Sequence, residues 1–230
     1  AILIGATIMA AVLTAAVLAP VLGAVADTSG RRMPWIRFFS VLYVAGSAGL
    51  WLLMPQQPAL IQAVVLFGIG LIGVEFATIF TNALLPGLAP RNEIGRLSGS
   101  GYAFGYLGGV LSLAVMLALF QETPGGKTLI GIEPLFGLDP AAREGTRFVG
   151  PFVAIWYAAF MIPFFLWVRE PRGPRRPVRI GAAMADLVAL IRSLRHRRSL
   201  AAWLASSMLS RDALNALYGF GGVYAGTVLG

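Results

Sequence analysis

Residues 23–32 read GAVADTSGRR and join two long apolar runs of the sequence. Glycines let membrane helices approach closely, a carboxylate can accept hydrogen bonds at a neighbouring helix N-terminus, and a basic pair favours the cytoplasmic side of a membrane. The spacing therefore predicts a tight cytoplasmic turn that governs how two membrane helices pack and switch. The residues that define this turn are Gly23, Asp27, Gly30, Arg31 and Arg32.

The composition supports a membrane protein. The chain has 230 residues, of which 57% are hydrophobic and 12% are charged, and its mean hydropathy is +0.77. A soluble domain carries about 25% charged residues, so an ordinary cytosolic enzyme is excluded. The chain has no cysteine and one histidine, and we therefore expect no cofactor, no metal site and no thiol nucleophile.

Six apolar stretches are long enough to cross a bilayer, which requires about 20 residues. The sequence begins and ends inside such stretches, and we interpret it as an internal fragment of a longer chain. We predict an all-α bundle with spans at residues 2–26, 35–54, 59–85, 98–120, 148–168 and 199–229.

The basic residues set the orientation of these spans. Nearly all lie in the loops 27–37, 86–97 and 169–198, whereas the opposite loops hold only Lys127, Arg143 and Arg147. Basic loops stay cytoplasmic, so the first span runs from outside to inside. The net charge of +8 then reflects topology rather than nucleic-acid binding. A soluble helical bundle, the alternative, would not sort its arginines by alternate loop.

The third basic loop contains a second pattern. It opens with a proline- and arginine-rich run at 169–177, and residues 180–198 then carry apolar side chains at helical spacing followed by arginines. This pattern predicts an amphipathic helix, either along the inner leaflet or as a plain cytoplasmic linker. His196 is interpreted as a solvated residue of that linker.

Polar residues inside apolar spans are functional candidates, because ionisable groups are costly there. Glu75, Thr78 and Asn82 share one helical face and predict a polar stripe that binds substrate or protons. Asp212 and Asn215 form a second candidate pair, with an interhelical structural pair as the alternative.

A glycine-rich face occurs between residues 98 and 120. Its spacing permits close helix packing, and we leave open whether this packing is static or allows rocking between two states. The residues are Gly101, Gly105, Gly108 and Gly109.

Four stretches resemble the major facilitator superfamily, and in particular its autophagy-linked vacuolar effluxer branch. They are GRRMPW at 30–35, NALLP at 82–86, RLSGSGYAFGYLGG at 96–109 and RDALNAL at 211–217. The resemblance implies two related helical halves, with this chain covering the second to seventh helices. Residues 1–168 would be an N-terminal bundle without its first helix, 169–198 a cytoplasmic linker and 199–230 the first helix of the C-terminal bundle.

The predicted function is secondary active transport of a small polar solute by alternating access. The resemblance implies neutral amino acids as substrates, and the acids in the spans suggest protons as the coupling ion. We expect a multi-pass, monomeric protein of the bacterial inner membrane. The alternatives are a lipid-handling or sensor protein on the same fold and, with less support, an intramembrane enzyme.

Overall fold

A computed structural model describes residues 2–29, 31–54, 59–170 and 180–224. Within these ranges the chain is helical and contains no strand, which confirms the all-α prediction. The elements are α1 (Ile2–Ser29), α2 (Met33–Gly49), η1 (Leu50–Leu52), α3 (Leu60–Leu88), α4 (Ile94–Leu119), η2 (Leu135–Gly137), α5 (Glu144–Arg147), α6 (Val149–Trp167), α7 (Ile180–Leu194) and α8 (Arg198–Tyr224).

Every predicted span coincides with a long helix. In the described part of the chain, four helical stretches combine the length and hydropathy of a membrane span: Met33–Leu52, Leu60–Leu88, Ile94–Leu119 and Glu144–Trp167. α1 and α8 coincide with the two remaining predicted spans. α1 extends past its predicted end and α4 begins before its predicted start, because polar residues next to the apolar run continue the helix, whereas α2 and α6 end before their predicted ends. The predicted end of the last span, at residue 229, lies outside the described residues.

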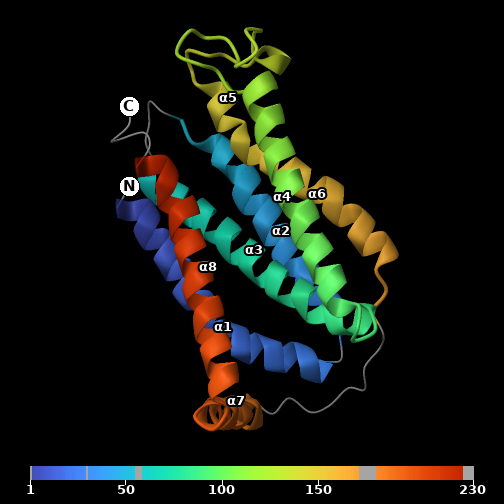
Figure 1. Cartoon of the computed structure of the whole chain (residues 1–230). Coiled ribbons are helices and arrows are strands. Elements are labelled where there is room, and N and C mark those ends of the chain that lie inside the picture. The colour runs from blue at the N-terminus through green and yellow to red at the C-terminus, as the bar shows by residue number, and fades with distance from the viewer. Residues whose placement is uncertain (1, 30, 55–58, 171–179, 225–230) are drawn as a thin grey trace.

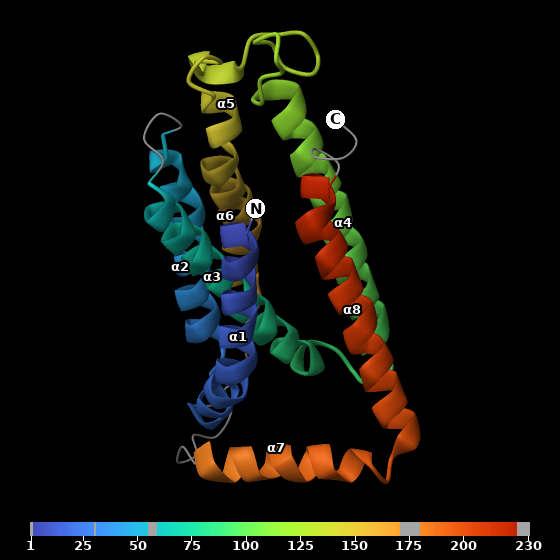
Figure 2. The ribbon, with the colours of Figure 1, turned by 90° about the vertical axis from the view of Figure 1, so that its left-hand side faces the viewer.

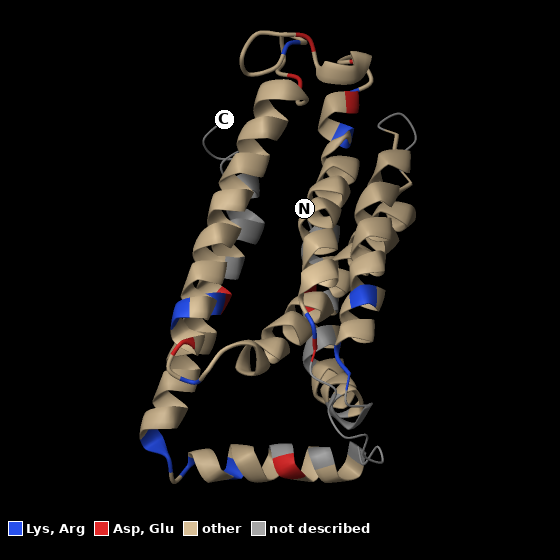
Figure 3. Cartoon of the chain, turned by 90° about the vertical axis from the view of Figure 1, so that its right-hand side faces the viewer, with Lys and Arg blue, Asp and Glu red and all other residues tan. Residues whose placement is uncertain are grey.

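The long helices run between two ends of the molecule, and α7 lies across one of them, roughly perpendicular to the bundle (Figures 1 and 2). The starts of α2 and α4 and the end of α6 lie toward this same end, whereas α5 and the loop before it lie at the other (Figure 1). Basic residues gather toward the α7 end (Figure 3). We therefore call the α7 end the cytoplasmic end.

The packed centre of the molecule lies between α1, α2, α3 and α6. Aromatic rings fill it: Phe39 of α2 stacks on Phe76 of α3 with ring centroids 4.7 Å apart, and on Phe80 at 5.9 Å. Ile36 and Phe76 are fully buried. These side chains recur at three- and four-residue spacing and therefore form one face of each helix.

Glycines allow the backbones of α2, α3 and α6 to touch. A Cβ at Gly73 would lie 2.5 Å from the Tyr43 nitrogen, and one at Gly46 would lie 2.5 Å from the Gly70 nitrogen. A Cβ at Gly150 of α6 would collide with the carbonyl oxygen of Ser47. In the described part of the chain, these glycines therefore mark where the helix backbones of α2, α3 and α6 come closest.

The glycines of α4 behave differently. A Cβ at any of them would meet no atom within 4 Å, so the described residues do not provide the close contact predicted for this face. α4 packs only lightly against α3 and α6, and the glycines border open space instead. The four positions are Gly101, Gly105, Gly108 and Gly109.

Candidate functional site

A cavity of about 710 Å³ lies between α3, α4 and α6. It is formed by the last part of α3, the first half of α4 and the end of α6, so it lies toward the cytoplasmic end. The lining residues are Thr78, Thr81, Asn82, Leu85, Leu88, Leu97, Ser98, Gly101, Tyr102, Gly105, Tyr106, Phe164 and Val168.

Helical spacing explains how each wall forms. Thr78, Asn82 and Leu85 occupy one face of α3 because residues three and four apart lie above one another. On α4, Gly101 and Gly105 face the same space, and the lack of a side chain there leaves room between the helices. The glycines thus widen the cavity rather than close a helix interface.

The lining defines the chemistry of the cavity. Its hydrogen-bonding groups are threonine, serine and tyrosine hydroxyls and the Asn82 amide, and none of the lining side chains carries a formal charge at neutral pH. Leucine, valine and phenylalanine supply the remaining surface. Pockets of this kind fix a ligand through a few polar groups on an apolar wall, so the cavity suits a small uncharged ligand with hydrogen-bonding groups.

A second cavity of about 610 Å³ lies further along α4, between α2, α4 and α6. Gly105 lines both cavities. Tyr157 lines the second one; its hydroxyl is 2.8 Å from the Ser40 hydroxyl, and its ring meets Tyr43 edge-on at 4.6 Å. These contacts hold the aromatic wall of the second cavity in place.

The predicted stripe on α3 is divided between two environments. Thr78 and Asn82 line the first cavity, whereas Glu75, one turn earlier, lines neither cavity. Glu75 is half-buried, and its carboxylate forms no hydrogen bond or ion pair with a described residue. Because Glu75 lies inside a membrane span and has no described partner, it is the strongest candidate for proton binding among the predicted residues.

The second predicted pair is not brought to the cavities. Asp212 is exposed on α8, and no residue of α8 lines either cavity. The side chain of Asn215 lies outside the described part of the structure. Among element pairs with more than marginal contact, α8 packs against α7. The described residues of α8 therefore do not contribute to either cavity.

Residues of the cytoplasmic turn form hydrogen bonds with α3 and with the segment after α6. The sequence predicted the turn but not these contacts. The Arg32 guanidinium donates a hydrogen bond of 2.9 Å to the carbonyl of Ala83 in α3. Glu170, just after α6, accepts hydrogen bonds from the backbone N–H groups of Arg32 at 2.7 Å and Met33 at 2.9 Å. These contacts join α2, α3 and α6 at the cytoplasmic end.

The other predicted residues of the turn are Gly23, Asp27, Gly30 and Arg31. Gly23 lies in α1 with nothing within 4 Å of its Cβ position, and Arg31 is exposed. The side chain of Asp27 and the whole of Gly30 lie outside the described residues, so their predicted roles stay predictions.

Sequence reasoning missed Glu170. It is an isolated acid at the start of a strongly basic loop, and that contrast was the available signal. Its carboxylate caps the N-terminus of α2, where unpaired N–H groups and the helix dipole favour a negative charge.

Replacing Glu170 with glutamine should lower the free energy of unfolding by about 1–2 kcal/mol, because a neutral amide cannot accept both hydrogen bonds as strongly or complement the dipole. Thermal unfolding of the full-length protein in detergent measures this effect. Glu93→Gln is the matched control, since Glu93 is the N-cap residue of α4 and makes no side-chain capping bond. Equal unfolding midpoints for both variants would show that the cap is unimportant.

The opposite end has its own connections. Arg147 donates a hydrogen bond of 2.6 Å to the carbonyl of Trp51, and its guanidinium lies 4.8 Å from the centre of the Trp51 ring. Glu122 accepts hydrogen bonds from the hydroxyl and the backbone N–H of Thr146 at 2.6 and 3.0 Å. The loop between α4 and α6 is therefore ordered against the helix ends.

The long apolar helices define a multi-pass membrane protein, and comparison with known proteins identifies its family. The chain belongs to the Atg22-like vacuole effluxer family, whose model matches residues 6–230. This membership and the all-α structure confirm the predicted partial bundle of the major facilitator type.

A curated relative agrees with this assignment. The chain is 24% identical over 167 residues to YxiO, described as an uncharacterised MFS-type transporter of Bacillus subtilis (strain 168). The match covers 73% of this chain and 36% of that protein, so the chain spans well under half of its relative. No solved structure matches the chain.

Proposed function

We propose that the protein is a secondary active transporter that moves a small neutral polar solute by alternating access. The observation that carries this proposal is the cavity between α3, α4 and α6, whose lining supplies hydroxyl and amide groups without formal charge. Family membership supports the transporter class. Transport sites of this class lie between helices in the membrane and open alternately to either side.

The proposed movement is that of one loosely packed helix, α4, against a tightly packed group of three helices. α2, α3 and α6 are fixed to one another by glycine contacts and by the Arg32 and Glu170 hydrogen bonds. α4 lies beside them with few contacts and open space along its glycine face. We propose that α4 moves against this rigid group, which would change access to the cavity.

The proposal extends to the substrate class, the oligomeric state and the membrane of the protein. We propose neutral amino acids, the substrate class that the family resemblance implies, as the solute; their net charge of zero is compatible with a lining that has no formal charge. We also propose a monomer in the bacterial cytoplasmic membrane, in which 1–168 belong to the N-terminal bundle, 169–198 to the linker and 199–230 to the C-terminal bundle. In this scheme the chain supplies the second to seventh helices.

Counterflow in proteoliposomes tests the proposal. The full-length protein is reconstituted, the vesicles are loaded with a neutral amino acid, and entry of the same labelled amino acid is followed. We expect saturable entry well above that of protein-free vesicles for at least one neutral amino acid. The apolar part of the lining also favours a second candidate, lipid handling; movement of a labelled lipid without solute entry would favour it.

Glu75→Gln should abolish the effect of a pH gradient on uptake while leaving counterflow, because glutamine cannot bind or release a proton. Uptake of the transported solute with and without an imposed gradient measures this effect. Glu93→Gln, which changes an exposed acid outside the spans, serves as the control and should keep gradient dependence. If Glu75→Gln retains the dependence of the unaltered protein, Glu75 is not the coupling group.

A further inference from the structure

The corner between α7 and α8 is the most basic exposed part of the described chain near the membrane helices. Arg195, Arg197 and Arg198 lie here within four residues, and all are exposed. The sequence from 187 to 211 contains no acidic residue. We propose that this corner and the apolar face of α7 bind the anionic phospholipid surface of the inner leaflet.

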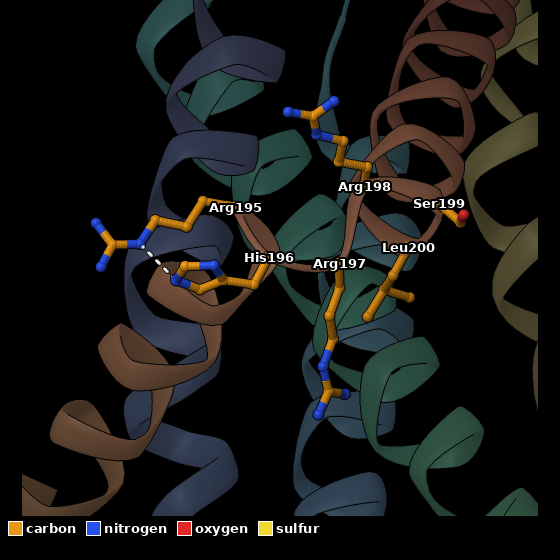
Figure 4. Close-up of a pocket in the computed structure, with 6 residues that line it drawn as sticks. All are labelled: Arg195, His196, Arg197, Arg198, Ser199 and Leu200. Atoms are coloured by element: carbon orange, nitrogen blue, oxygen red, sulfur yellow. Dashed lines mark hydrogen bonds between the residues drawn. The ribbon is translucent and has the colours of Figure 1, made fainter.

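The corner borders a shallow, open space. A space of about 650 Å³ is lined by residues 195–200, where α7 ends and α8 begins. Figure 4 shows the three guanidinium groups pointing in different directions, with Arg195 hydrogen-bonded to His196 at 3.1 Å. Guanidinium groups that diverge cannot enclose one anion, but they can contact several headgroups spread over a surface.

α7, which precedes these arginines, has an exposed apolar face. Apolar side chains recur at three- and four-residue spacing along one face of α7, and Val188 and Ile191, three residues apart on this face, are 45% and 58% exposed. Asp186 and Arg192 lie to either side of that face and not at its centre. A helix with one apolar face and basic residues at its end is typical of segments that lie in the membrane interface.

The position of α7 favours lipid over a protein partner. The helix lies across the ends of the membrane helices rather than along them (Figure 2). A protein covering residues 195–198 would need to present acids to several diverging arginines, whereas an anionic leaflet presents negative charge over the whole surface. The charge and the apolar face therefore point to the same occupant.

Lipid binding can be measured on the full-length protein in neutral detergent micelles with a fluorescent phosphatidylglycerol. Each arginine near an anionic surface contributes about 1 kcal/mol, so R197Q/R198Q should weaken binding about 30-fold. K127Q/R143Q removes two positive charges from the opposite end and should bind like the unaltered protein. Equal affinity of both double variants would overturn the proposal.

A second measurement requires no charge variant and distinguishes the occupants. An environment-sensitive fluorophore at Ile191→Cys should shift to shorter wavelength in nanodiscs that contain phosphatidylglycerol, relative to phosphatidylcholine alone, and high salt should reverse the shift. A fluorophore that is already buried and unaffected by lipid would indicate a protein cover and contradict the proposal. Inorganic phosphate that displaces the labelled lipid at millimolar concentration would indicate a free-anion site and would also contradict it.

Discussion

Replacing Gly73 with alanine should destabilise the protein by about 1–3 kcal/mol, which is the usual cost of overpacking a tight core. The new Cβ would lie 2.5 Å from the Tyr43 nitrogen and 2.8 Å from the Phe39 oxygen. Both neighbours are backbone atoms of α2, which cannot rotate away as a side chain could. α2 and α3 would therefore have to separate along the most extensive helix contact of the bundle.

Thermal unfolding of the full-length protein in detergent measures this loss, and Gly99→Ala is the matched control. Gly99 lies in α4, is exposed, and has nothing within 4 Å of its Cβ position. Alanine there should be neutral or should stabilise by about 0.5–1 kcal/mol, because glycine is unfavourable inside a helix. The packing account fails if Gly73→Ala unfolds at the same temperature as Gly99→Ala.

Replacing Gly105 with phenylalanine should reduce solute counterflow by roughly tenfold or more while the protein remains folded. Gly105 lines both cavities, and no atom lies within 4 Å of its Cβ position. A large side chain can therefore enter the space without a backbone collision and occupy the volume that a ligand requires. The defect should appear in transport and not in the unfolding midpoint.

Gly99→Phe separates cavity filling from a general effect of a large residue on α4. It places the same side chain on the same helix, at an exposed position that lines neither cavity. We expect this variant to transport at close to the unaltered rate. Equal transport by both variants would mean that the solute does not pass through either cavity.

Much of the fold could be predicted from the sequence because apolar length and arginine placement are local signals. The spans and α7 coincide with the predicted segments, since a helix in the membrane needs only a continuous apolar run of sufficient length. That Thr78 and Asn82 share a face could also be predicted, because helical spacing determines which residues of a helix lie on the same side.

The remaining features depend on which helices become neighbours, and spacing within one helix does not contain that information. Gly73 contacts Tyr43 because α3 lies against α2, whereas the more regular glycines of α4 border open space. Glu170 reaches Met33 from a distant part of the chain. Asp212 shares the chemistry of a site residue, but its helix packs mainly against α7.

Substrate protection of a cysteine at Asn82 tests the central claim most directly. Asn82 lines the cavity between α3, α4 and α6, and this sequence contains no other cysteine. In the full-length protein with any further cysteine replaced, Asn82→Cys is alkylated by a water-soluble maleimide with and without the solute that counterflow identifies. The account predicts that the solute slows alkylation at least about fivefold, with a half-maximal concentration near that of transport. An alkylation rate that saturating solute leaves unchanged, in a variant that still transports, would contradict the assignment of the cavity as the solute path.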